Sequence, residues 1–296
     1  MNQQKNNDLL LMIQQRYDDF SKGQKLIANY IADHYDKAAY VTAAKLGEIV
    51  GVSESTVVRF AIELGYDGYP KLQKALQELI KSKLTSVQRI EVSSNRINED
   101  NVLKSVLQSD IEKIKITLEQ IELDDFNNVV ETILNANRIF ILGVRSSATL
   151  ASFLGFYFNL IFDNVRLVHT TSVSEMFEQI MRAQSGDVVI GISYPRYSKR
   201  TIKAMQYAKS QGAITIALTD SIESPVAQCA DLSLLARSDM ASFVDSLVAP
   251  LSVINALIAA IGMRRKNEVY NTFEHLEKVW DEYNVYDKDD NHDVKL

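Results

Sequence analysis

Residues 42–65 read TAAKLGEIVGVSESTVVRFAIELG, a stretch that predicts two helices joined by a tight turn. Thr42 is a residue type that caps helix N-termini, and Gly51 is the type that lets a chain leave a helix. Ser53 then caps the second helix, and Gly65 closes it. The first helix is expected to bury one apolar stripe, made of Ala43, Leu46, Ile49 and Val50.

The second helix of this pair divides into an apolar and a polar face. Helical spacing places four apolar residues on the inward face: Val57, Phe60, Ala61 and Leu64. The same spacing directs outward Ser55, Thr56, Arg59 and Glu63. In a helix-turn-helix, the N-terminal residues of the second helix meet base edges in the major groove, and short hydroxyl side chains permit that close approach. We therefore expect this pair of helices to bind double-stranded DNA.

The exposed residues suit different parts of a duplex. Arg59 can donate two hydrogen bonds to guanine or bind a phosphate, and Ser55 lies on the same face. Ser53 and Thr56 stand beside free amides at a helix N-terminus, which favours phosphate. Contacts to the DNA backbone are expected from three lysines, Lys45, Lys71 and Lys74. The alternative is an ordinary pair of packed helices whose hydroxyls are solvated.

Length and charge divide the chain into two parts. A chain of 296 residues with 46% hydrophobic content is long enough for two domains with separate cores. Residues 1–90 carry 12 Lys+Arg against 10 Asp+Glu, whereas the whole chain has a net charge of −6. The N-terminal part is therefore the expected nucleic-acid partner, with its affinity drawn from a small basic face and from the pairing of two copies.

Several classes of protein are not expected. Cys229 is the single cysteine, which excludes an intrachain disulfide and a cysteine-rich metal site and favours a reducing compartment. The first residues lack the apolar core of a signal peptide, so we expect a cytoplasmic protein. The longest apolar stretch, residues 247–261, falls short of the roughly 20 residues that span a bilayer, so no membrane partner is expected. No motif predicts a metal ion or another cofactor.

Periodicity divides the chain into four segments. We predict an all-helical helix-turn-helix domain at residues 1–84, a linker at 85–101, an α/β domain at 102–285 and a charged tail at 286–296. In the α/β segment, short apolar runs alternate with helices, at residues 138–144, 165–168, 187–192, 214–218 and 232–235. Such runs are typical of strands buried on both faces, so we predict a five-stranded parallel sheet in an α/β/α arrangement.

Two of the predicted strands end in loops that combine hydroxyls with an arginine. Ligands of parallel sheets bind beyond the carboxyl ends of the strands, where helix N-termini offer free amides to anions. We therefore expect a small anionic effector at these loops, held by Gly143, Arg145, Ser146, Ser147, Ser193, Arg196 and Ser198. Glu175, which opens a helix after the second strand, is a further candidate for this site.

At these motifs the chain resembles a known family. Residues 51–60 (GVSESTVVRF) and 64–70 (LGYDGYP) are similar to the N-terminal domain of RpiR-type bacterial transcriptional regulators, and residues 120–265 resemble their sugar isomerase (SIS) domain. Tyr66 of this motif joins the expected DNA contacts. The resemblance implies a DNA-binding regulator, in particular a repressor, of carbohydrate or related metabolism, whose operator affinity changes when the SIS domain binds a phosphosugar.

The loops match the family in part. Residues that correspond to the phosphate loops of the family are Gly143, Ser147, Ser193 and Ser198. Arg145 stands where a second glycine is common, and Pro195-Arg196 replaces the usual serine-glycine pair. Because arginine forks suit carboxylates, the effector is expected to be either a phosphosugar or a sugar acid.

Two other functions are open at this point. A SIS-type domain can catalyse aldose-ketose isomerisation, which needs a general base beside the substrate carbon. Glu175 is the best candidate for that base, although an acid in the first turn of a helix is also favoured by the helix dipole alone. A phosphosugar isomerase with an accessory helical domain is therefore the alternative function. A third is a sensor that only docks proteins.

A homodimer is the expected assembly, with a tetramer as the larger alternative. The predicted helix at residues 148–162 is apolar nearly all round, so one side can rest on the sheet while the other meets a second subunit. Residues 243–261 are another contributor, and burial within the monomer is the alternative. A dimer would place two recognition helices on adjacent groove turns of a near-palindromic operator.

Overall fold

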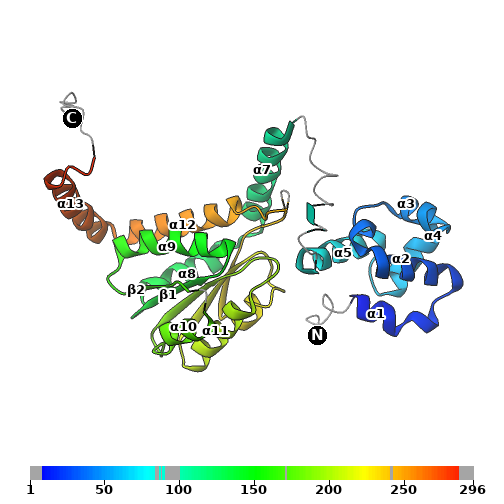
Figure 1. The fold of residues 1–296 in the computed structure, drawn as a ribbon, viewed down its shortest axis with the longest axis horizontal. Coiled ribbons are helices and arrows are strands. Elements are labelled where there is room, and N and C mark those ends of the chain that lie inside the picture. Colours follow the sequence, from blue (N-terminus) through cyan, green and yellow to red (C-terminus); the bar gives the residue numbers. More distant parts are fainter. Residues whose placement is uncertain are drawn as a thin grey trace. The chain divides into compact units, whose positions relative to one another are not determined.

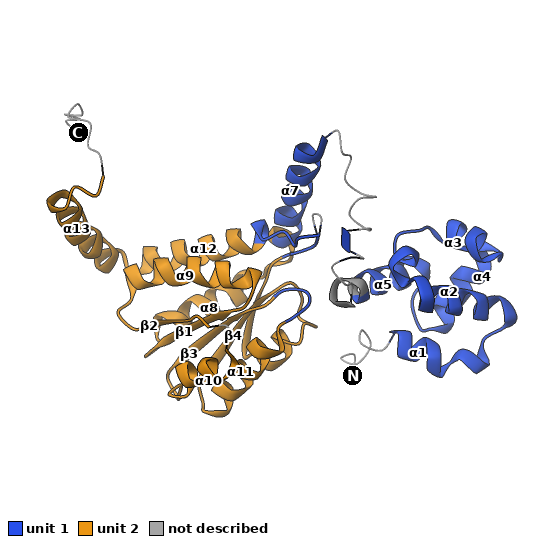
Figure 2. Cartoon of the chain, in the orientation of Figure 1, with its two compact units in different colours: residues 1–117, 194–197, 237–249 blue, residues 118–193, 198–236, 250–296 orange. Residues whose placement is uncertain are grey.

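The structure is a computed structural model that describes residues 9–83, 87, 89–90, 101–170, 172–240 and 243–286. It forms two compact units (Figure 2). Unit 1 contains residues 1–117, 194–197 and 237–249, and unit 2 contains residues 118–193, 198–236 and 250–296. Most of the predicted linker at residues 85–101 lies outside the described residues, as does the predicted charged tail apart from Tyr286.

The first part of unit 1 is helical, as predicted (Figure 1). Its elements are α1 (Leu9–Gln15), η1 (Tyr17–Asp19), α2 (Lys22–Ala38), α3 (Ala43–Val50), α4 (Glu54–Glu63) and α5 (Tyr69–Lys83). A further helix, α7 (Val102–Gln120), extends from unit 1 into unit 2. Helix α2 begins with a capping box in which Ser21 and Gln24 each accept a hydrogen bond from the other's backbone amide.

One core joins these helices. The rings of Phe20 and Phe60 lie 5.1 Å apart between centroids, so the residue before the α2 cap packs directly on α4. The inward face predicted for α4 is confirmed, because its apolar residues are all buried: Val57, Phe60, Ala61 and Leu64. The stripe predicted for α3 is wrong at Ile49, which is 43% exposed, because Gly47 is buried in its place at the approach to α4.

Unit 2 contains the predicted five-stranded parallel sheet. The strands are β1 (Ile139–Gly143), β2 (Val165–Val168), β3 (Val188–Ile192), β4 (Ile214–Thr219) and β5 (Leu232–Leu235), and their order is β2-β1-β3-β4-β5. At the amino ends of β1 and β3, Arg138 and the fully buried Asp187 form a two-pronged ion pair, with N···O distances of 3.1 and 2.6 Å. This pair holds β1 beside β3.

Helices cover both faces of the sheet (Figure 1). One face carries α8 (Leu123–Leu134) and α9 (Ser146–Ile161), and the other carries α10 (Val173–Ile180) and α11 (Lys199–Ser210). The turn η3 (Ala227–Cys229) precedes β5, and α12 (Val248–Arg264) and α13 (Lys266–Glu282) end the described fold. On α9, Leu150, Leu154 and Phe158 are buried by the chain itself, while Phe156 is 62% exposed.

Helix α12 begins at Val248, so that Pro250 occupies its first turn, where the missing proline N–H costs nothing. No single helix in the described part of the chain is long and apolar enough to cross a membrane; α12 and α13 reach that length only together, with a bend of 96° between them.

Candidate functional site

The turn between α3 and α4 depends on two glycines. Gly51 ends α3 in the left-handed conformation, with φ at 75°, and the Val52 amide donates a 2.8 Å hydrogen bond back to the Gly47 carbonyl. A Cβ atom at Gly47 would lie 2.6 Å from the Val52 carbonyl oxygen, closer than any side chain tolerates. The sequence reasoning missed Gly47, and a glycine within a helical pattern was the available signal.

The N-terminal turn of α4 satisfies its own hydrogen bonds. The Ser53 side chain accepts from the Thr56 amide at 3.3 Å, and its oxygen also lies 2.9 Å from the Ser55 hydroxyl and 2.8 Å from the Thr56 hydroxyl. The Arg59 Nε atom donates to the Ser55 carbonyl at 3.2 Å, which aligns the guanidinium along the helix. The structure therefore presents a preformed cluster of hydroxyls beside one arginine.

The predicted DNA contacts do not all share one environment. The exposed members are Lys45, Ser53, Ser55, Arg59, Lys71 and Lys74, and Thr56 is half-buried. Tyr66 differs, because its hydroxyl oxygen is buried against the core and has no hydrogen-bond partner among the described residues. Burial also raises the pKa of this phenol. The structure thus directs the Tyr66 hydroxyl away from the surface that carries the other candidates.

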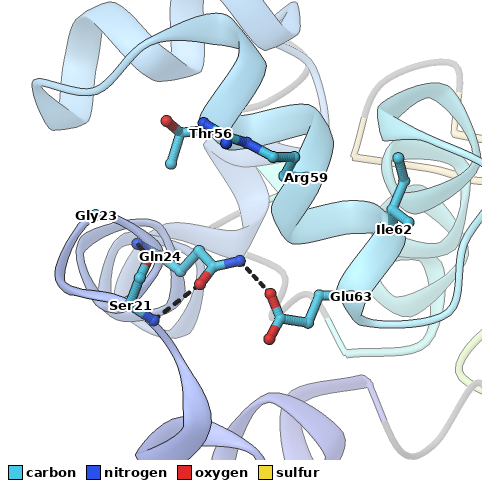
Figure 3. Close-up of a pocket in the computed structure, with 7 residues that line it drawn as sticks. All are labelled: Ser21, Gly23, Gln24, Thr56, Arg59, Ile62 and Glu63. Atoms are coloured by element: carbon cyan, nitrogen blue, oxygen red, sulfur yellow. Dashed lines mark hydrogen bonds between the residues drawn. The ribbon is translucent and has the colours of Figure 1, made fainter.

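A groove between α2 and α4 extends this surface (Figure 3). Thr56 and Arg59 of α4 line it on one side, and the first turn of α2 lines it on the other, close enough that a Cβ at Gly23 would lie 3.3 Å from the Thr56 methyl group. At the far end of the groove, Gln24 donates a hydrogen bond to the Glu63 carboxylate. This contact joins α4 to α2 and gives the Glu63 carboxylate a partner.

Tyr69 anchors the start of α5 beneath this surface. Its buried hydroxyl donates to two carbonyl oxygens in the connection between α2 and α3, those of Ala38 at 3.1 Å and Val41 at 2.9 Å. Burial, with a smaller contribution from Tyr30, raises the pKa of Tyr69 from 10.0 to about 12. The phenol therefore remains protonated and able to donate at neutral pH.

The second candidate site lies at the carboxyl edge of the sheet. In the strand order β2-β1-β3-β4-β5, the chain proceeds from β1 to one side to reach β2 and to the other side to reach β3, β4 and β5. In parallel sheets of this order, ligands bind at the point between β1 and β3 where the order changes sides. Gly143, the last residue of β1, is paired with Ile192, the last residue of β3. The two loops predicted to hold an anion, one after each of these strands, therefore start side by side.

Each of these loops contains an arginine with a positive φ angle, a backbone conformation that favours glycine. Arg145 has a φ angle of 58° and a ψ angle of −128°, and Arg196 has a φ angle of 68°. These are the two positions where the resembling family commonly has glycine, and holding a non-glycine residue there costs about 1–3 kcal/mol. Strain of this kind persists where the surroundings enforce it, often at ligand sites.

The serines of the two loops are held close to the backbone. Ser147, in the first turn of α9, is 6% exposed, and a Cβ atom at Gly143 would lie 2.4 Å from its carbonyl oxygen. Ser193 is 2% exposed, and its hydroxyl accepts a 3.0 Å hydrogen bond from the Ser198 amide. Ser198 in turn caps α11 by accepting from the Thr201 amide at 3.3 Å. Ser146 is exposed at the start of α9.

Glu175 occupies the position expected of a helix-opening acid. Its backbone amide donates to Ser172, the cap of α10, and its carboxylate accepts a hydrogen bond from Thr170. These contacts give the residue a local structural role and leave it exposed. Within the described residues, no group of three or more His, Cys, Asp or Glu side chains is placed to hold a metal ion.

Two family models match the chain. Residues 7–83 match the helix-turn-helix domain of the rpiR family, and residues 132–260 match the SIS domain. Among curated proteins, the chain is 26% identical to an uncharacterized HTH-type transcriptional regulator of Caldanaerobacter subterraneus over 92% of this chain and 96% of that protein. It is 27% identical to the HTH-type transcriptional regulator HexR of Escherichia coli, over 87% and 89% of the two chains.

Solved structures share the fold. The Vibrio vulnificus NanR protein complexed with ManNAc-6P aligns with a TM-score of 0.58 and 20% identity over 92% of this chain and 97% of that chain. The sugar isomerase domain of an RpiR transcription factor from Sphaerobacter thermophilus aligns with a TM-score of 0.56 and 28% identity, over 58% of this chain and 96% of that domain. The curated relatives named above are regulators rather than isomerases, which agrees with the expectation that this chain is not an enzyme.

Proposed function

The chain belongs to the RpiR family of helix-turn-helix transcriptional regulators, and from that premise we propose that it is a repressor controlled by an anionic sugar derivative. In this proposal the first half of α4 enters the major groove of an operator. The effector occupies the carboxyl edge of the sheet, at the point between β1 and β3 where the strand order changes sides. The protein acts in the cytoplasm, where operator DNA is found.

One observation supports the DNA-binding half of this proposal above the others. The hydroxyls of α4 cap the helix and bond to one another, so they project as a preformed polar surface beside Arg59. Binding would order few side chains, because they already have one arrangement. Arg59 is assigned to a base edge, and the surrounding serines and lysines are assigned to phosphates.

The effector-binding half rests on the two strained loops. We assign the anion to the N-terminal ends of α9 and α11, with hydroxyls from Ser147, Ser193 and Ser198 and charge from Arg145 and Arg196. A phosphosugar or a sugar acid fits this set, since guanidinium groups bind both phosphate and carboxylate. ManNAc-6P, the ligand of the NanR protein, is one compound of that class.

Control of DNA binding requires two arrangements that the effector distinguishes. We propose a homodimer, or a tetramer built from it, in which the bound anion favours one spacing of the two recognition helices. An effector shifts such an equilibrium only by the difference in its affinity for the two arrangements. The operator would be a near-palindrome with half-sites one helical turn apart.

The DNA-binding half is tested with a duplex enriched from a random-sequence pool by the full-length protein. Replacement of Arg59 by alanine is expected to weaken binding of this duplex about 10- to 100-fold in gel-shift titrations, the range for loss of one two-pronged base contact. The matched control is Lys37→Ala, which removes one positive charge at the far end of α2 and should leave the affinity nearly unchanged. Equal affinities for wild type and Arg59→Ala would refute the assignment.

The effector-binding half is tested by thermal unfolding in the presence of a panel of anions. The panel contains phosphosugars, among them ManNAc-6P, together with sugar acids and inorganic phosphate. A true effector is expected to raise the unfolding temperature by mass action and to shift the gel-shift titration of the enriched duplex. An anion that stabilises the protein without changing its DNA affinity would contradict the proposed coupling between the two sites, but not the presence of either site.

A further inference from the structure

Helix α7 buries polar residues and exposes apolar ones, the opposite of an ordinary surface helix. Its buried residues are polar, with Lys113 at 4% and Thr117 at 6% exposure. Its apolar residues include strongly exposed ones, with Leu103 at 75% and Leu118 at 74% exposure. A surface helix of a self-sufficient domain shows the opposite arrangement, because apolar surface is driven out of water. In the described part of the chain, nothing covers the outward face of α7.

Hydrogen bonds fix the rotation of α7 about its own axis. The Asp110 carboxylate accepts a 2.6 Å hydrogen bond from the Ser246 hydroxyl, and the Lys113 ammonium lies 3.5 Å from the same carboxylate. The Thr117 hydroxyl accepts from the Arg237 backbone amide at 2.9 Å. Turning the apolar face inward would break these contacts and leave buried polar groups unsatisfied. The outward direction of the apolar face is thus built into the fold.

The apolar face forms one continuous stripe. Its residues recur at intervals of three and four and are all exposed in the single chain: Leu103, Leu107, Ile111, Ile114 and Leu118. At 1.5 Å per residue the stripe is about 22 Å long. Contiguous exposed apolar surface of this extent marks an interaction site, and intervals of three and four are those of helices that pack side by side.

We propose that this stripe, named the α7 seam, pairs antiparallel with the α7 seam of a second copy of the chain. The spacing is close to a palindrome about the midpoint between Asp110 and Ile111. A two-fold axis at that midpoint sets Leu103 opposite the partner's Leu118 and Leu107 opposite the partner's Ile114. A symmetric interface requires this kind of self-complementary surface. The inference rests on the proposed pairing of two copies and assigns a surface to it.

The helix dipole favours the antiparallel direction. Antiparallel pairing sets the two helix dipoles in opposition, whereas a parallel pair would bring the ends of like partial charge together. The Asp110 carboxylate beside the seam is already engaged by Ser246.

The seam is tested by the association of full-length protein in sedimentation equilibrium. The variant Leu107→Gln/Ile114→Gln changes only exposed positions, so it should fold as the wild type does, and its dimer dissociation constant is expected to rise at least about tenfold. The matched control is Ile222→Gln/Val285→Gln, which replaces two side chains of similar exposure outside the seam and should leave the constant unchanged.

Each outcome separates the seam from the proposed function. A wild-type dimer whose dissociation constant is the same in the α7 variant overturns the seam and leaves the proposed regulator intact. A monomeric wild type overturns the seam together with the proposed pairing, while gel-shift titration still reports DNA binding separately. A monomer that the α7 variant destabilises shows that another part of the same chain covers the stripe, and it likewise overturns the seam.

Cysteine cross-linking decides the direction of pairing. In a Cys229→Ser background, copies carrying Leu103→Cys are mixed with copies carrying Leu118→Cys and oxidised. Disulfides need Cα atoms within about 7 Å, so the antiparallel seam predicts cross-linked dimers in the mixture and none in either variant alone. Cross-linking of Leu103→Cys with itself would establish parallel pairing and overturn the proposal. Absence of any cross-link would overturn it as well.

Discussion

The start of α4 and the carboxyl edge of the sheet both contain residues with positive φ angles, but the residue types at these positions differ. Around α4, the left-handed positions are filled by glycine, with φ at 75° for Gly51 and 85° for Gly65. At the sheet edge, comparable positions are filled by Arg145 and Arg196. The positive φ angles around α4 therefore cause no backbone strain, whereas those at the sheet edge strain the backbone of two arginines.

This difference teaches which residues at each place are used for their side chains. A glycine at a left-handed position needs no other reason to be there, because it adopts that conformation at no steric cost. An arginine at such a position opposes its own backbone preference, so the surrounding fold must enforce the conformation. We therefore expect the glycines near α4 to act through the fold alone and the arginines of the sheet edge to act through their charge.

Gly47→Ala is expected to have the largest effect on the unstrained side of this comparison. The added Cβ would meet the Val52 carbonyl oxygen at 2.6 Å and force α3 and α4 apart, which should cost about 1–3 kcal/mol of stability and most of the DNA affinity. Thermal unfolding and gel-shift titration measure the two losses. Gly262→Ala is the control, since a Cβ there meets nothing within 4 Å. Equal stability of Gly47→Ala and wild type would contradict the close approach.

Gly51→Ala isolates the cost of the left-handed backbone. A Cβ at Gly51 has nothing within 4 Å, so only the φ angle of 75° opposes the substitution, and we expect a loss of about 1 kcal/mol. Urea denaturation followed by circular dichroism measures this loss. A larger loss of stability than that of Gly47→Ala would show that the left-handed backbone of Gly51 contributes more to the stability of this turn than the close packing at Gly47 does.

Tyr69→Phe tests the hydrogen bonds beneath the DNA-facing surface, where the expected loss at pH 7 is about 1 kcal/mol. Because the pKa of Tyr69 is raised to about 12 in the folded chain, its contribution to stability is complete below pH 10 and is lost as the pH rises from 10 to 12. The difference in stability between wild type and Tyr69→Phe should therefore shrink over that interval. A difference that stays constant from pH 9 to pH 12 would rule out this account.

Arg145→Gly carries the smallest expected effect on stability, and it has the opposite sign. Relief of the strained φ angle is partly offset by the greater freedom of glycine in the unfolded chain, so we expect a gain of about 0.5 kcal/mol. The same variant should lose the thermal stabilisation that the effector gives to the wild type. Retention of that response would mean that the arginine does not touch the anion.

The sequence alone was sufficient for features that depend on residues three or four positions apart. Ser53 and Thr42 cap the predicted helices, Gly51 ends α3, and the inward face of α4 is the predicted one, because caps and helical spacing are local properties. The five apolar runs predicted five parallel strands. Burial on both faces, the reason for that prediction, holds for the inner strands β1 and β3, whereas the edge strand β2 carries the exposed Arg166.

Tertiary structure alone decided which of these elements meet. Neither the exposure of Ile49 nor the burial of the Tyr66 hydroxyl follows from helical spacing, because both depend on how neighbouring helices pack. The strand order that sets Gly143 beside Ile192 joins residues far apart in the chain, and the outward apolar face of α7 follows from hydrogen bonds to residues 237 and 246. Local sequence determines what each segment can form, while long-range packing determines which of its faces remains for a partner.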